Sequence, residues 1–149
     1  MEDEIRHALL RALYAYWDDR RGGRIMPARS DLDPVDIPDL LRHLILLDVT
    51  HDPLRFRVRL YGTEVAELRG RDLTGRYLYE GEPTAIGDQT RPWNVETVET
   101  RSPHYVTGPF TDISDGRTGT FYRLGLPLSE EGERVDMLMI GLLREWGDV

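Results

Sequence analysis

Residues 44–76 constrain the fold of this chain more than any other stretch. The run LILLDV at 44–49 is almost continuously apolar, which is typical of a strand covered on both faces. After a break at His51-Asp52-Pro53, the segment RFRVRLY at 55–61 alternates arginine with apolar residues, which is typical of a strand covered on one face. A short helical segment at 63–69 and glycines at 70 and 75 follow. Strand, hairpin, strand, helix and glycine loop together predict the first half of a small α+β domain.

Composition excludes several kinds of chemistry. The chain has 149 residues, enough for one domain with its own core, and 40% of them are hydrophobic. It contains no cysteine, which excludes disulfides, cysteine-ligated metals and thiol nucleophiles. All 19 basic residues are arginine, so lysine Schiff-base chemistry is excluded as well.

Net charge and hydropathy indicate whether a nucleic acid or a membrane is an expected partner. The net charge of −8 argues against a nucleic-acid partner, because phosphate neutralisation dominates that affinity. No apolar run approaches the ~18 residues that a membrane span requires. The acidic N-terminus also lacks a signal-peptide pattern. We therefore expect a cytoplasmic protein that binds neither membrane nor nucleic acid.

The rest of the chain completes a five-stranded antiparallel sheet. Further strands are expected at 104–113, 119–128 and 135–143, and further helices at 84–89 and 92–100. The nearly continuous apolar run at 135–143 predicts a central strand, whereas the alternating strand at 54–61 predicts an edge. Numbering the strands along the chain, the order 2-1-5-4-3 satisfies three hairpins and two central strands. Helices of 63–101 are then expected on one face and an N-terminal helix on the other.

The N-terminal helix is expected at residues 2–21, with Asp3 as its N-cap and Gly22-Gly23 as its stop. Its buried face is predicted by helical spacing to comprise Ile5, Ala8, Leu9, Ala12, Leu13 and Tyr16. A second apolar stripe, Leu10, Tyr14 and Trp17, is either part of the same core or a surface for a homodimer. Residues 1–23 are accordingly expected to form this helix, and residues 24–149 the remainder of one structural domain.

Three long phrases carry a family resemblance: MPARSDLDPVDIPDLLRHLILLDV (26–49), RFRVRLYGTEVAELRGRDLTGR (55–76) and LPLSEEGERVDMLM (126–139). With them the chain resembles a bacterial family of small, stand-alone PAS-domain proteins. The resemblance implies a PAS-like fold that binds a small ligand between sheet and helices or serves as a dimerising interaction module. It implies no catalytic residues, and it implies a signal that passes to a separate, unidentified partner protein.

The candidate ligand pocket consists of apolar side chains expected near the inner face of the sheet. They are Phe56, Val58, Leu60, Tyr77, Trp93, Phe110, Tyr122, Met137 and Met139. Such a set suits a small apolar ligand, although ordinary core packing explains the same residues. The arginines at 55, 57 and 59 are expected to form the solvated face of the edge strand.

Cofactor and enzyme functions remain as alternatives. His104 is the one histidine expected near a pocket wall as a haem ligand, and Tyr77, Tyr79 and Trp93 are candidate flavin-stacking groups. Acidic residues of the later turns are not spaced for acid–base pairing, and no motif indicates a metal site. The sequence therefore predicts a non-enzymatic sensory module without cofactor or metal. The alternatives are a small isomerase- or hydratase-like enzyme, or a haem or flavin sensor.

Overall fold

The computed structural model describes residues 1–70, 72–80, 87–112 and 115–147. Three α-helices and five strands follow one another along these residues. They are α1 (Ala8–Arg21), β1 (Leu44–Thr50), β2 (Arg55–Tyr61), α2 (Thr63–Arg69), α3 (Gly87–Thr100), β3 (His104–Thr111), β4 (Thr118–Leu128) and β5 (Met137–Trp146). Single 3-10 turns at Glu2–Glu4, Arg29–Asp31, Pro34–Asp36 and Leu41–His43 lie before the sheet. No helix in the described ranges is long and apolar enough to cross a membrane.

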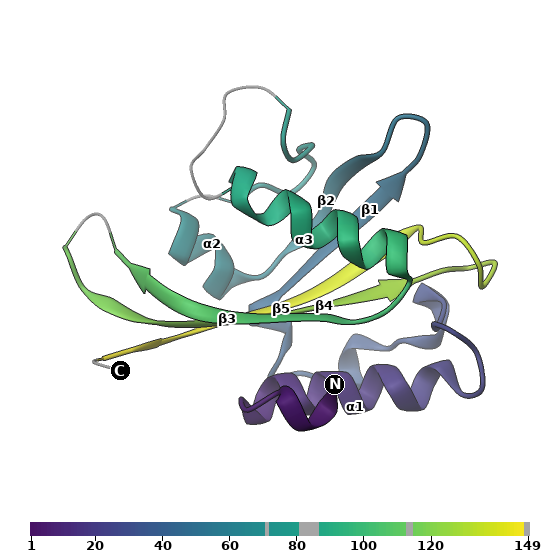
Figure 1. Cartoon of the computed structure of the whole chain (residues 1–149), viewed down its shortest axis with the longest axis horizontal. Helices are drawn as coiled ribbons and strands as arrows, with labels where there is room; N and C mark the ends of the chain where they lie inside the picture. The colour runs from purple at the N-terminus through teal and green to yellow at the C-terminus, as the bar shows by residue number, and fades with distance from the viewer. Residues whose placement is uncertain (71, 81–86, 113–114, 148–149) are drawn as a thin grey trace.

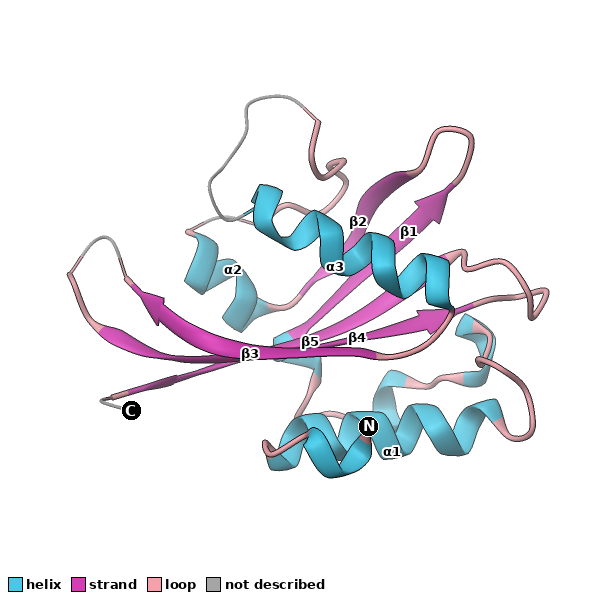
Figure 2. Ribbon diagram, viewed as in Figure 1, coloured by secondary structure: helices cyan, strands magenta, loops and turns pink. Residues whose placement is uncertain are grey.

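The strands form one antiparallel sheet in the order β2-β1-β5-β4-β3, which confirms the predicted topology. Helix α1 lies against one face, and α2 and α3 lie on the other (Figures 1 and 2). The apolar strands β1 and β5 are central, as their continuous hydrophobic runs predict. The sheet is therefore a middle layer between two helical layers.

Strand register assigns each side chain to one of these two faces. A Cβ on Gly141 would lie 2.6 Å from Leu10 Cδ2, so Gly141 faces α1. Because side chains alternate along a strand, Met137 and Met139 share this α1 face. On the opposite, α3 face, a Cβ on Gly125 would lie 3.4 Å from Thr97 Oγ1 of α3. Two glycines thus allow close helix approach on opposite sides of the sheet.

Helix α1 begins later than predicted and turns a different stripe inward. Its N-cap is His7, whose Nδ1 accepts a hydrogen bond from Leu9 N at 3.2 Å, rather than Asp3. Leu10, Leu13 and Trp17 are fully buried against the sheet, while Ala8 and Ala12 are exposed. The prediction of Leu10 and Trp17 as an exposed dimer stripe is therefore wrong, because the long side chains fill the space over the sheet. Tyr14 is half-buried beside the Trp17 ring.

The helical segment between β2 and β3 also differs from the prediction. Helix α2 has the predicted bounds, but α3 begins at Gly87 and contains Pro92 as an interior residue. The separate helix predicted at 84–89 lies partly outside the described residues. The edge strand β2 is not open, because Val58 N donates to Arg76 O and Gly75 N donates to Val58 O. Residues 75–78 thus cover the outer edge of β2.

Candidate functional site: a cleft between β2 and the start of α3

A cleft of about 290 Å³ opens where the β1–β2 hairpin approaches the start of α3. Its lining joins three segments: the hairpin and β2, the chain that covers the β2 edge, and α3. The lining residues are Pro53, Leu54, Arg55, Phe56, Leu78, Tyr79, Glu80 and Arg91. An apolar floor and a charged rim make it a plausible site for a small ligand with one polar end.

The rim of the cleft carries two arginines and one glutamate. Arg55 Nε and Nη2 donate to the two carboxylate oxygens of Glu80 at 2.9 and 2.8 Å. This hydrogen-bonded pair lowers the pKa of Glu80, and the Arg55 guanidinium also lies 3.7 Å from the centre of the Tyr77 ring. Arg91 has no ion-pair or hydrogen-bond partner among the described residues. Although the chain has a net charge of −8, the described lining of the cleft therefore carries one more positive than negative charge.

A chain of buried polar groups runs inward from the cleft. Asn94 Nδ2 donates to the Tyr79 hydroxyl at 2.6 Å, and Arg123 Nη2 donates to Asn94 Oδ1. Asn94 and Arg123 are only 1% and 4% exposed, although the surrounding core is apolar. The Tyr79 hydroxyl also bonds Thr90 Oγ1 at 2.7 Å. This relay, Tyr79–Asn94–Arg123, connects the cleft wall through α3 to the middle of β4.

Aromatic rings and an unusual backbone conformation hold the relay in place. Tyr79 has φ of 64°, in the left-handed region that non-glycine residues rarely adopt. Its ring packs edge-on against Phe56 at 5.8 Å. Arg123 lies 5.3 Å from the centre of the Trp93 ring, and Trp93 stacks on Phe121. Such strained, over-determined residues are concentrated at ligand sites and switches.

A contact between His104 and Glu96 joins the end of α3 to β3 beside the relay. His104 Nε2 lies 2.8 Å from Glu96 Oε2. Burial lowers the pKa of His104; the Glu96 carboxylate opposes this shift and the Arg123 guanidinium adds to it. His104 thus lies at a junction of α3, β3 and β4, with one ring nitrogen already committed to Glu96.

Acidification should destabilise the fold through His104. With its folded pKa below the ordinary 6.5, the native state binds fewer protons at this site than the unfolded chain. The stability due to neutral His104 is complete above that value and is lost as the pH falls toward the folded pKa. We expect His104→Gln to flatten the decline of melting temperature between about pH 7.5 and 5.5. A residual slope should remain from His43, whose pKa burial also lowers. An unchanged slope would contradict the assignment.

The predicted pocket residues do not share one cavity. Phe56, Val58 and Trp93 lie on the α3 side, whereas Leu60, Tyr122, Met137 and Met139 lie in register on the α1 face. Phe56 and Val58 are fully buried core residues, whereas Tyr77 is exposed and its ring stacks on the Arg55 guanidinium. Among these predicted residues, Phe56 alone lines the cleft. Alternation along each strand separates the others, and sequence alone does not reveal how a strand is turned.

Four polar residues of this region were not predicted from the sequence: Arg91, which lines the cleft, and Thr90, Asn94 and Arg123, which form the polar contacts behind Tyr79. One signal was present, since Arg123 is the single charged residue in the strand TGTFYRLGLPL at 118–128. A lone charge in a strand that is otherwise buried requires partners, and Asn94 and Trp93 are among them. Arg55 was predicted as a solvated edge residue; it instead forms part of the cleft wall.

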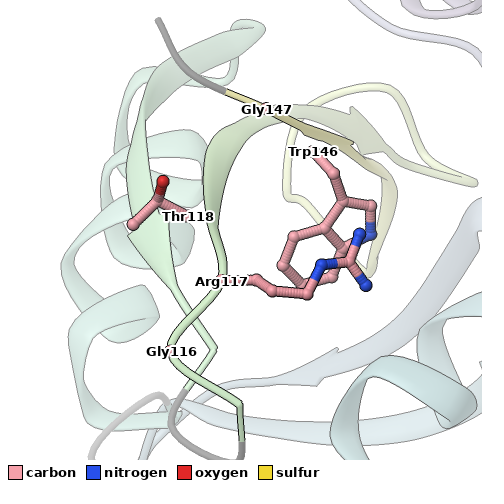
Figure 3. A pocket seen from close by; sticks show the side chains of 5 residues that line it. All are labelled: Gly116, Arg117, Thr118, Trp146 and Gly147. Atoms are coloured by element: carbon pink, nitrogen blue, oxygen red, sulfur yellow. The ribbon is translucent and has the colours of Figure 1, made fainter.

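A second hollow, of about 440 Å³, lies at the far end of the sheet. Arg117 stacks at 4.0 Å from the centre of the Trp146 ring, and Figure 3 shows its guanidinium over the indole. The Arg144 guanidinium lies 5.1 Å from the centre of the Trp146 ring and 4.6 Å from that of Phe110, and these two rings pack edge to face on each other at 4.9 Å. Phe110, predicted as a pocket residue, therefore belongs to this exposed stack and not to the cleft.

The described side chains give little support for acid–base catalysis or a metal site. The acids in the described turns, Asp115, Glu130, Glu131 and Glu133, are exposed and lie away from the cleft. Within the described ranges, no three His, Asp or Glu side chains approach closely enough to hold a metal ion. The groups that converge at the cleft are suited to binding an anion.

Comparison with known proteins places this fold in a family context. A family model described as a PAS domain matches residues 5–142. No curated protein matches the chain.

Several solved structures are similar. The PAS domain of Bordetella pertussis BvgS is 16% identical, with a TM-score of 0.47 over 68% of this chain and 74% of that one. A Rhodobacter sphaeroides LOV protein is 13% identical, with a TM-score of 0.47 over 76% and 68%. The ligand-binding domain of the Pseudomonas aeruginosa amino acid chemoreceptor PctC, in complex with GABA, is 14% identical. Its TM-score is 0.45 over 93% of this chain and 54% of that one.

Proposed function

Because the chain belongs to the PAS domain family, whose members are generally sensory modules, we propose that it senses a small monoanionic ligand without transforming it. The ligand binds in the cleft between β2 and α3. The observation that carries this proposal is the buried relay Tyr79–Asn94–Arg123, which joins the cleft to the centre of the sheet. An apolar core needs no such polar chain for stability, because desolvating these groups costs free energy.

The cleft walls specify the ligand's chemistry. Arg91 offers a guanidinium that no described residue pairs with, and its planar donors suit a carboxylate in a bidentate contact. Leu54, Phe56 and Leu78 provide a surface for an apolar body. The volume of about 290 Å³ limits the ligand to a small molecule. We therefore propose a small carboxylate with an apolar portion, in place of the wholly apolar ligand that the sequence suggested.

The relay would transmit occupancy of the cleft. A ligand that contacts Tyr79 changes the position of its hydroxyl, which accepts from Asn94 on α3. Asn94 in turn accepts from Arg123 on β4, and β4 pairs with β3 along the whole of β3. Ligand binding at one end of α3 would thus alter the strand at the sheet edge. Support for a non-enzymatic role comes from the cleft itself, where Glu80, the one carboxylate among the described lining residues, is held ionised by Arg55.

Carboxylate binding can be tested with benzoate and its neutral isostere benzamide. Benzoate should raise the melting temperature and saturate, whereas benzamide at equal concentration should have little effect, because it lacks the charge that Arg91 recognises. Arg91→Gln should weaken benzoate binding by roughly tenfold or more, since a charged hydrogen bond contributes about 1.5–3 kcal/mol. Isothermal titration calorimetry measures both affinities.

Arg6→Gln serves as the matched control. Arg6 is exposed and precedes α1, which packs on the opposite face of the sheet, so its loss should leave benzoate binding unchanged. Equal effects of benzoate and benzamide would contradict an anion site. Equal losses in Arg91→Gln and Arg6→Gln would show that only general charge is sensed. A panel of aliphatic monocarboxylates then defines the length of the apolar portion.

A further inference from the structure

The two edges of the sheet differ in whether their outer backbone groups are paired. The outer side of β2 is paired with residues 75–78, but no described residue pairs with the outer side of β3. Strand β3 lies at the edge nearest the viewer in Figure 1 and runs for eight residues. An open edge of this length is a template for another strand.

Hydrogen-bond parity identifies the backbone groups on the open side. Asp112 N donates to Arg117 O, so the even-numbered residues of this strand face β4. The N–H groups of Tyr105, Thr107 and Thr111 therefore point outward. Residue 109 is also outward, and it is a proline without an N–H. The open edge thus offers three donors and a longer row of carbonyl acceptors.

The edge is also neutral, unlike the rest of the chain. Its sequence, HYVTGPFT, contains no Asp, Glu or Arg, although 31% of all residues are charged. Natural edge strands are usually protected by inward or flanking charges. Two copies of a chain with a net charge of −8 repel each other, so a contact between them requires a neutral surface. Strand β3 provides one.

We propose that β3 pairs antiparallel with β3 of a second copy, with the two-fold axis at Thr107 or Gly108. With the axis at Thr107, the two Thr107 residues exchange hydrogen bonds and Tyr105 N donates to the partner's Pro109 O. With the axis at Gly108, Thr107 N donates to the partner's Pro109 O, and Tyr105 and Thr111 exchange bonds. In either register every outward N–H has an acceptor, and Pro109, which has no N–H, serves only as an acceptor through its carbonyl.

The side chains of β3 agree with a two-fold pairing. Residues 106, 108 and 110 lie on the α3 side, and they comprise a valine, a glycine and a phenylalanine. About Thr107, Val106 faces the partner's Gly108, so a branched side chain meets an unoccupied position. Thr107 itself is exposed on the other side, and its hydroxyl donates to Phe121 O at 2.8 Å. No like charges meet at the centre in either register.

Sedimentation velocity on the full chain, over roughly a hundredfold range of concentration, tests this pairing. We expect a monomer–dimer equilibrium. Thr107→Glu places two carboxylates opposite or diagonal to each other across the axis, which should weaken dimerisation by about tenfold or more. Thr50→Glu is the matched control, because Thr50 is an exposed strand residue at the distant end of β1; its dimerisation should be unchanged.

A second variant separates pairing from charge. Thr107→Pro removes the central outward N–H and leaves the backbone hydrogen bonds between β3 and β4 in place. It removes the bond from the Thr107 hydroxyl to Phe121 O, as Thr107→Glu also does. Thr107→Pro should also yield a monomer. Circular dichroism establishes that each variant is folded. A wild-type monomer at every concentration, or a dimer unaffected by either folded Thr107 variant, would overturn the pairing. Benzoate calorimetry on the same variants remains independent, so the loss of the dimer does not decide the ligand proposal.

Discussion

Trp17→Ala should lower the free energy of unfolding by about 3–5 kcal/mol, the usual range for removing a large aromatic side chain from a core. Trp17 is 1% exposed, and its Nε1 donates to Pro127 O at 2.9 Å. Truncation therefore leaves a cavity between α1 and the sheet and an unpaired backbone carbonyl. Urea unfolding monitored by circular dichroism measures the change.

Tyr14→Ala is the matched control for that substitution. Tyr14 lies next to Trp17 on α1 but is half-buried, so its removal should cost clearly less. A large loss in Trp17→Ala with a small loss in Tyr14→Ala supports α1 as an integral layer of the domain. Comparable small losses in both would indicate that α1 is only loosely docked. Any change of oligomeric state in Trp17→Ala would then be secondary to unfolding.

Arg123→Met should be the second large effect, about 2–4 kcal/mol. The substitution keeps an unbranched side chain with an apolar stem but removes the donor to Asn94 Oδ1 and the cation over Trp93. A buried amide oxygen left without a donor costs about 1–3 kcal/mol, and the lost cation–π contact adds to this. Arg6→Gln, on the surface, should stay within about 0.5 kcal/mol of wild type.

A double-mutant cycle isolates the bond between Arg123 and Asn94. Arg123→Met together with Asn94→Leu removes both partners, so the double variant should be more stable than the sum of the single losses predicts, by about 0.5–3 kcal/mol. Strict additivity would mean that the two groups do not act as a unit. The cycle measures stability alone and does not depend on any ligand.

The single variant Arg123→Met also tests whether ligand binding is transmitted along the relay. Arg123→Met leaves Arg91 and the apolar floor in place, so benzoate should still bind in the cleft. In the wild-type protein, benzoate should shift amide resonances of α3, β4 and β3; in Arg123→Met the shifts should stop at α3. Full propagation to β3 in the variant would show that the signal takes another route. Loss of binding would show that Arg123 contacts the ligand directly.

The two faces of the sheet explain why the relay is informative. Above the α1 face, Leu10, Leu13 and Trp17 pack on leucine and methionine side chains in a wholly apolar layer. Below α3, three polar residues, Asn94, Thr97 and Arg123, are buried in the contact between helix and sheet. These three polar residues are almost as deeply buried as Leu10, Leu13 and Trp17. The proposed sensing function would account for polar groups where apolar ones would pack.

Local pattern was sufficient to predict the sheet. The apolar runs at 44–50 and 135–143 identified the central strands, and the Asp-Gly turn at 115–116 identified a hairpin, because short-range chemistry determines these features. The strand order followed from hairpin connections and the exclusion of polar edges from the centre. Helix boundaries were predicted less accurately. The first helix begins at Ala8 and not at residue 2, because Ile5 is buried in the core and His7 caps the helix, and helical spacing shows neither contact.

What the sequence alone determined was the succession of elements, the sheet order and the family, since all three depend on patterns of neighbouring residues. Only the tertiary structure decided which stripe of α1 is buried, which face each pocket candidate occupies, and that Arg91, Asn94 and Arg123 converge with Tyr79. Tyr79, the α3 residues and Arg123 come from three separate segments, and their meeting depends on strand register and on the rotation of α3 over Gly125. A one-residue shift in strand register would move every side chain of that strand to the other face, and a one-residue rotation of α3 would turn its side chains by about 100°. No local pattern specifies either choice.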